Sequence, residues 1–154
     1  MAVARSFYGE LLGCEEGRSD TNWVDFNLYG HQLVCHLSAL PSPPTDDNKN
    51  AVNGHAVPIP HFGVVLEMEE WRALRDKLVI ADIAFIIEPH IRFAGLAGEQ
   101  ATLFFYDPSG NAIEFKAFKN IAAELLRNRH RVILNRGVIM AHSANAGIAE
   151  CKVV

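Results

Sequence analysis

The 154-residue chain has no apolar run that approaches the roughly 20 residues of a membrane-spanning helix. Its N-terminus shows no charged segment followed by an apolar one, so no secretion signal is indicated. Lysine and arginine total 14 against 18 acidic residues, which gives a net charge of −4, and the basic residues form no stripe. These absences argue against a membrane partner and against a nucleic-acid partner.

Cysteine is also scarce. Cys14, Cys35 and Cys151 are odd in number and widely spaced, and the chain contains no CxxC pair. A reduced, cytoplasmic location is the simplest interpretation. Cys35 falls in an alternating apolar stretch, where a packed thiol is expected more often than a nucleophile.

The first part of the chain predicts a helix followed by a β-hairpin. Apolar residues recur four apart within residues 3–12, which is typical of one helical face, and Gly13 is a common helix stop. Residues 23–28 and 32–37 alternate between apolar and polar on either side of a turn at residues 29–30. This alternation predicts two paired strands.

Residues 41–60 are rich in proline and polar residues, and we interpret them as an exposed connecting loop. The pattern of regular elements then restarts at His61. It predicts a strand at 62–66, a helix at 67–79, a strand at 84–87, a loop at 89–98, and strands at 102–106 and 111–118. This second unit therefore has the order β-α-β-β-β.

The first unit repeats this order without its first strand, so the predicted fold is α+β, with paired βαβββ modules and an incomplete first module. We divide the chain into a first module at 1–40, a connecting loop at 41–60, a second module at 61–118, and a C-terminal extension at 119–154 of unassigned structure. The helices of the two modules begin 67 residues apart, at Ala4 and Trp71. By that offset the counterpart of His61 would precede Met1, so the missing strand is expected upstream of the chain.

Glu114 and His61 are the candidate metal ligands. Glu114 falls on the strand face opposite Ile113 and Phe115, and a carboxylate on a central strand needs a cation, hydrogen bonds or water. His61 opens an apolar strand. An exposed glutamate beside Lys116 and a structural histidine are the simpler alternatives. Together, imidazole and carboxylate suit Mn, Fe, Ni or Zn.

Two further residues are candidates for lining a substrate pocket. His36 shares a strand face with Val34, which is the counterpart of Glu114 at an offset of 80 residues. Arg92, next to His90 in a predicted loop, is placed to border an anionic substrate or to lie on a plain loop surface. A further alternative is a tail strand at 138–142, which would fill the vacant sheet edge and offer His142 as a metal ligand.

Two motifs resemble those of a known superfamily. Residues 7–13 (FYGELLG) are similar to the first-helix signature of the vicinal-oxygen-chelate superfamily, which includes glyoxalase I, extradiol dioxygenases and bleomycin- or fosfomycin-resistance proteins. Residues 107–114 (DPSGNAIE) resemble its closing motif, in which a glutamate ligand follows a D-P-x-G-N turn. The likeness spans residues 3–118.

The resemblance implies paired βαβββ modules around a divalent metal that chelates vicinal oxygens of a small-molecule substrate. His61 and Glu114 match the ligands of the second module, and His36, Arg92 and Phe104 would shape the pocket. A glyoxalase-like or dioxygenase-like enzyme is thus expected, acting as a homodimer. A non-catalytic, resistance-type binding protein and an inactive truncated form are the alternatives.

Overall fold

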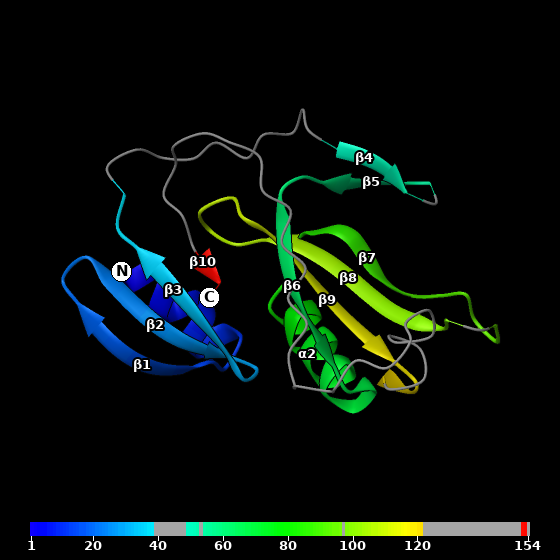
Figure 1. Ribbon diagram of the computed structural model, residues 1–154, viewed down its shortest axis with the longest axis horizontal. Helices are drawn as coiled ribbons and strands as arrows, with labels where there is room; N and C mark the ends of the chain where they lie inside the picture. The colour runs from blue at the N-terminus through cyan, green and yellow to red at the C-terminus, as the bar shows by residue number, and fades with distance from the viewer. Residues whose placement is uncertain (39–48, 53, 97, 122–151, 154) are drawn as a thin grey trace, which may run out of the picture.

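The computed structural model describes residues 1–38, 49–52, 54–96, 98–121 and 152–153 (Figure 1). It is an α+β fold made of two four-stranded sheets, each with helical structure on one side, and a separate hairpin. The predicted tail strand at 138–142, His142 and Cys151 lie outside the described residues. Within the described ranges, no helix is long and apolar enough to cross a membrane.

The first module begins with a helical segment and continues with three antiparallel strands. Its elements are α1 (Ala2–Ala4), the π-helical η1 (Arg5–Leu11), β1 (Glu15–Asp20), β2 (Trp23–Leu28) and β3 (His31–His36). The sheet order is β1-β2-β3-β10, where β10 is the short strand Lys152–Val153. The helix and the hairpin that follows it agree with the sequence prediction, whereas no residue range was predicted for β1, the first of the three strands that the repeat implies.

The second module has the predicted order β-α-β-β-β. Its elements are β6 (His61–Leu66), α2 (Met68–Ile80), β7 (Phe85–Arg92), β8 (Gln100–Tyr106) and β9 (Ala112–Phe118). The sheet order is β6-β9-β8-β7, with β6 parallel to β9 and the other pairs antiparallel. Paired modules of the βαβββ type are therefore confirmed.

The two sheets correspond strand for strand except at one edge. In the second sheet β6 lies beside β9, and in the first sheet the same position beside β3 is held by β10. The pairing differs in direction, because β10 runs antiparallel to β3 and contacts Leu33 and Val34. The edge at which the first module was expected to lack a strand is thus partly covered by the end of the same chain.

Two segments differ from their predicted structure. Part of the expected connecting loop forms a hairpin, β4 (Lys49–Val52) and β5 (His55–Pro58). The prediction of a loop over residues 89–98 is wrong at its start, because β7 continues through Pro89 to Arg92. Proline is tolerated there because β7 is an edge strand with irregular pairing.

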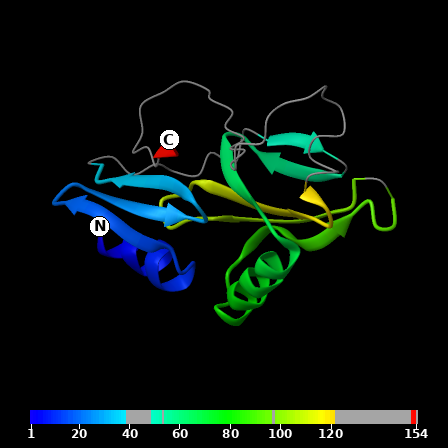
Figure 2. The same ribbon diagram turned by 60° about the horizontal axis from the view of Figure 1, so that its bottom comes forward.

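The two modules share one hydrophobic core on the helical side of the sheets. It contains Phe7 and Phe26 from the first module together with Trp71, Phe105 and Phe115 from the second. Figure 2 shows both helices on one side of the sheets and the β4–β5 hairpin on the other side of the second sheet. The face of the second sheet that points away from the core is therefore available to form a pocket.

Candidate functional site

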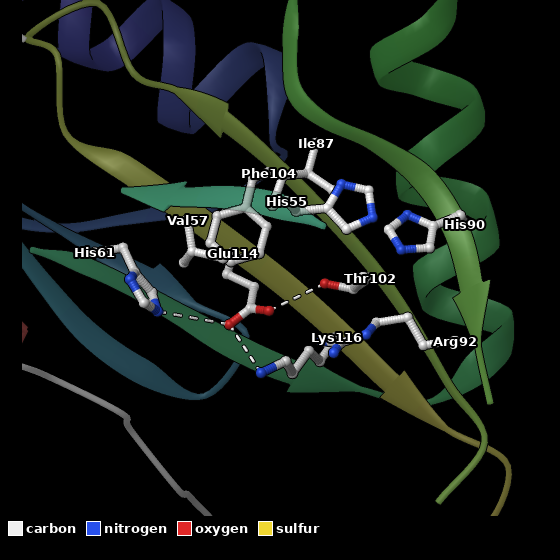
Figure 3. Close-up of a pocket in the computed structure, with 10 residues that line it drawn as sticks. All are labelled: His55, Val57, His61, Ile87, His90, Arg92, Thr102, Phe104, Glu114 and Lys116. Carbon is white, nitrogen blue, oxygen red and sulfur yellow. Dashed lines mark hydrogen bonds and ion pairs between the residues drawn. The ribbon is translucent and has the colours of Figure 1, made fainter. Parts of the chain in front are cut away.

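A pocket of about 170 Å³ lies between the second sheet and the β4–β5 hairpin (Figure 3). An engineered cavity of roughly 150 Å³ holds benzene, so this pocket can hold a ligand of about one six-membered ring. The residues that line it are His55, Val57, His61, Ile87, His90, Arg92, Thr102, Phe104, Glu114 and Lys116.

Strand register explains why these side chains share one face. Residues directly opposite one another in neighbouring strands point to the same side of a sheet. Phe104 pairs with Glu114, and Thr102 pairs with both Lys116 and His90. The pairing of β7 with β8 also shifts register between Ile87 and His90. This irregularity inserts one extra residue, so side chains three apart in β7 both face the pocket.

The carboxylate of Glu114 is the polar centre of the pocket. The residue is only 6% exposed. Its Oε1 accepts a hydrogen bond of 3.0 Å from the Thr102 hydroxyl, and its Oε2 lies 3.0 Å from Lys116 Nζ and 3.8 Å from His61 Nε2. The ammonium and the hydroxyl offset the cost of burying the charge.

His61 is oriented by the end of the hairpin. Its Nδ1 donates to the carbonyl of Pro58 at 2.8 Å, because a carbonyl only accepts. In the neutral ring this bond leaves the Nε2 lone pair free, and Nε2 is the atom that faces Glu114. The ring also makes an edge contact with Phe104, with ring centroids 5.3 Å apart.

The opposite wall of the pocket carries His55, His90 and Arg92. The rings of His55 and His90 stack with centroids 4.9 Å apart, and His90 Nδ1 donates to the Glu88 carbonyl at 2.6 Å. The Arg92 guanidinium lies over the ring of Phe93, 5.2 Å from its centroid. This wall joins β7 to the hairpin.

Four of the five predicted site residues line this pocket. His61, Glu114, Arg92 and Phe104 come together in it, whereas His36 does not line it. His36 is exposed on β3 in the first sheet, opposite Trp23.

Sequence reasoning missed Thr102 and His55 and treated Lys116 only as a neighbour of Glu114. Lys116 follows Glu114 by two residues and so shares its face, which was a readable signal. Thr102 required the register of β8 against β9. His55 required the hairpin, because it reaches the pocket from a segment that was expected to be a loop.

The fold and the pocket together define a class: a two-module α+β protein with a ring-sized pocket on the open face of one sheet. Comparison with known families identifies the family to which the chain belongs. The family model described as Glyoxalase/Bleomycin resistance protein/Dioxygenase superfamily matches residues 1–115. The chain belongs to this superfamily, and the resemblance seen in its motifs is confirmed. No curated protein matches the chain by sequence.

Solved structures agree with this assignment. A glyoxalase/bleomycin resistance protein/dioxygenase from Alicyclobacillus acidocaldarius is 30% identical, with a TM-score of 0.59, covering 79% of this chain and 86% of that one. A glyoxalase/dioxygenase from Nostoc punctiforme is 19% identical with a TM-score of 0.56, covering 75% and 82%. A fosfomycin resistance protein from Listeria monocytogenes is 15% identical with a TM-score of 0.56, covering 82% and 88%. The latter two show the fold alone.

Proposed function

We propose that the pocket holds a divalent metal between His61 and Glu114 and that the metal chelates oxygens of a small-molecule substrate, as in a glyoxalase-like or dioxygenase-like enzyme. The observation that supports this most strongly is the orientation of His61. Its Nδ1–H is tied to the Pro58 carbonyl, and its Nε2 faces the buried carboxylate of Glu114. A ligating histidine usually donates its other ring N–H to an acceptor in this way.

The two side chains fit a metal ion. Metal–imidazole and metal–carboxylate bonds to zinc are about 2.0–2.2 Å long, so two donor atoms on one ion lie about 3.4 Å apart at the tetrahedral angle and at most about 4.2 Å apart on opposite sides of the ion. His61 Nε2 and Glu114 Oε2 are 3.8 Å apart, and Thr102 holds the other carboxylate oxygen. One nitrogen and one oxygen donor suit Mn, Fe, Ni or Zn rather than a soft metal.

In this proposal His61 and Glu114 are the two ligands that the protein supplies, and further ligands come from elsewhere. Across the described ranges, no group of three or more His, Cys, Asp and Glu side chains is arranged to hold a metal. In this proposal, oxygens of the substrate or water would complete the coordination. When bound, the metal would supply Lewis-acid polarisation of those oxygens. Phe104 and the hairpin would shield the bound substrate from water, and Thr102 would keep Glu114 in place.

A metal-free binding protein is the second candidate function, and Lys116 favours it. The Lys116 ammonium is 3.0 Å from Glu114 Oε2, the same oxygen that faces His61. A metal at this oxygen would have to displace the ammonium. If Lys116 stays in place, the pocket binds its ligand through the lysine and the aromatic walls without turnover.

Metal content separates the two candidates. The protein would be dialysed anaerobically against Mn, Fe, Ni or Zn in turn, and bound metal measured by mass spectrometry. We expect H61A and E114A to weaken binding of at least one of these metals by about tenfold or more. The matched control is H36A, which removes an exposed histidine outside the pocket. If wild type binds no more metal than E114A, the metal-dependent function fails and the Lys116-centred candidate remains.

A further inference from the structure

The pocket carries a positive charge that the protein itself does not neutralise. It contains the carboxylate of Glu114 and the cationic side chains of Lys116 and Arg92. Lys116 is paired with Glu114 at 3.0 Å. Within the part of the chain that the structure describes, the Arg92 guanidinium forms no ion pair or hydrogen bond. The chain as a whole has a net charge of −4, so this local excess of positive charge runs against its overall balance.

Arg92 is held in position toward the pocket. Figure 3 shows its side chain extending from the end of β7 toward Lys116. The guanidinium rests on the ring of Phe93, whose backbone has a φ of 55°. A bulky residue rarely adopts this left-handed conformation, and such strain is typical of residues near binding sites. The turn at Phe93 places its ring over the Arg92 guanidinium.

The remaining walls favour a flat ligand body. Phe104 and the stacked rings of His55 and His90 line the same cavity. Its volume of about 170 Å³ leaves room for one ring with a small substituent. A planar guanidinium binds carboxylate and phosphonate oxygens through two parallel hydrogen bonds.

We propose that Arg92 recognises an anionic oxygen group, a carboxylate or a phosphonate, on a ring-sized ligand whose body lies between Phe104 and the His55–His90 pair. This inference deepens the proposed function and rests on it in one respect, that this pocket is the ligand site. It does not require a metal, because Arg92 is neither of the two proposed metal ligands, His61 and Glu114, and lies on a different strand from both. Carboxylate and phosphonate ligands share the chemistry, and the test separates them.

The test uses benzoate and phenylphosphonate as anionic probes and benzamide as a neutral probe of the same shape. Binding to the full chain would be measured by calorimetry, with and without added metal, and located by amide chemical shifts. We expect R92Q to weaken binding of at least one anionic probe by about tenfold or more, as for a lost charge-assisted hydrogen bond. R92K keeps the charge but loses the planar fork, and an intermediate affinity is expected.

The matched control is R72Q, which alters an exposed arginine on α2 that pairs with Glu69 outside the pocket. It should bind the anionic probes as wild type does. The proposal is overturned if benzamide binds wild type as tightly as both anions, if neither anion binds wild type, or if R92Q retains wild-type affinity. The metal content of R92Q separates this inference from the proposed function. If R92Q loses anion binding and its metal content equals that of wild type, the role of Arg92 in anion recognition is supported, whether or not wild type binds a metal.

Discussion

Gly63 shows how a single residue sets the geometry of the site. It lies on β6 opposite Glu114 on β9, in the parallel strand pair whose β6 member begins at His61. A methyl group added at Gly63 would overlap the backbone carbonyl of Glu114. Glycine therefore allows the two strands to approach closely enough to bring His61 beside the Glu114 carboxylate.

The substitution G63A is expected to destabilise the protein by about 1–3 kcal/mol, because the overlap falls on backbone that cannot move aside without shifting β9. The free energy of unfolding would be measured in urea. G9A is the matched control, since a methyl group at Gly9 meets its nearest neighbour at an ordinary 3.7 Å. A loss no larger for G63A than for G9A would show that β6 and β9 have room to adjust.

Cys14 makes the free energy of unfolding depend on pH in the alkaline range. Burial raises the pKa of its thiol from 9.0 to about 11. In the unfolded chain the thiol ionises from about pH 9, whereas in the folded protein it stays protonated to about pH 11. The stability that comes from the buried neutral thiol is thus fully present below pH 9 and is lost between these values.

Between pH 8 and pH 10.5, wild type should lose about 2 kcal/mol more unfolding free energy than C14A, which has no thiol to ionise. Denaturant unfolding at the two pH values measures this difference. Tyr29, whose pKa burial raises to about 12, is present in both proteins, and only the smaller effect of the Cys14 charge on its pKa differs between them. Equal losses in the two proteins would contradict the assignment to Cys14.

At the scale of elements, the sequence predicted those with strong periodicity. The helix predicted at 67–79 is found as α2 at Met68–Ile80, with Trp71, Leu74 and Leu78 buried as expected. The strands at β2, β3, β6, β8 and β9 were also predicted, because each alternates or forms a short apolar run between turn residues.

The elements that were missed lack such a pattern. All six residues of β1 are exposed, and its sequence EEGRSD has no alternation. The hairpin β4–β5 has its own two-stranded sheet and follows a proline-rich segment. The second half of β7 contains Pro89 and a register shift, so its periodicity is broken where it passes His90. In these cases tertiary packing decides the structure, and local propensity does not show it.

The same distinction applies to the site. His61 and Glu114, which stay predicted metal ligands, were selected from their position in strands of clear register and from the motif that ends at Glu114. Lys116 and Thr102 complete the charge and hydrogen-bond balance of Glu114, and they depend on which strands pair. His36 was chosen from the internal repeat, but the repeat relates the two sheets and does not bring β3 into the pocket.

At the scale of the molecule, one buried hydrogen bond links the two modules. The Tyr8 hydroxyl in η1 donates to Asp107 Oδ2 at 2.7 Å in the turn before β9. The same carboxylate accepts from the backbone N–H groups of Ser109 and Asn111, so it also shapes that turn. The closing motif therefore joins the first module to the strand that bears Glu114.

Y8F should lower the free energy of unfolding by about 1–3 kcal/mol, because it leaves a buried carboxylate with one hydrogen bond fewer. Chemical denaturation measures this loss. Y106F is the control, since the Tyr106 hydroxyl makes no hydrogen bond within the described ranges. If both variants unfold alike, the Tyr8–Asp107 bond does not hold the modules together.

The homodimer and the cytoplasmic location stay predictions from the sequence.

The central claim is that His61 and Glu114 hold one metal ion together. The most direct measurement is X-ray diffraction from crystals grown with zinc or manganese, with anomalous data collected at the metal edge. We expect a metal peak about 2.0–2.2 Å from both His61 Nε2 and Glu114 Oε2, with the Lys116 ammonium moved away. A pocket without a metal peak, in which Lys116 remains bound to Glu114, would contradict it.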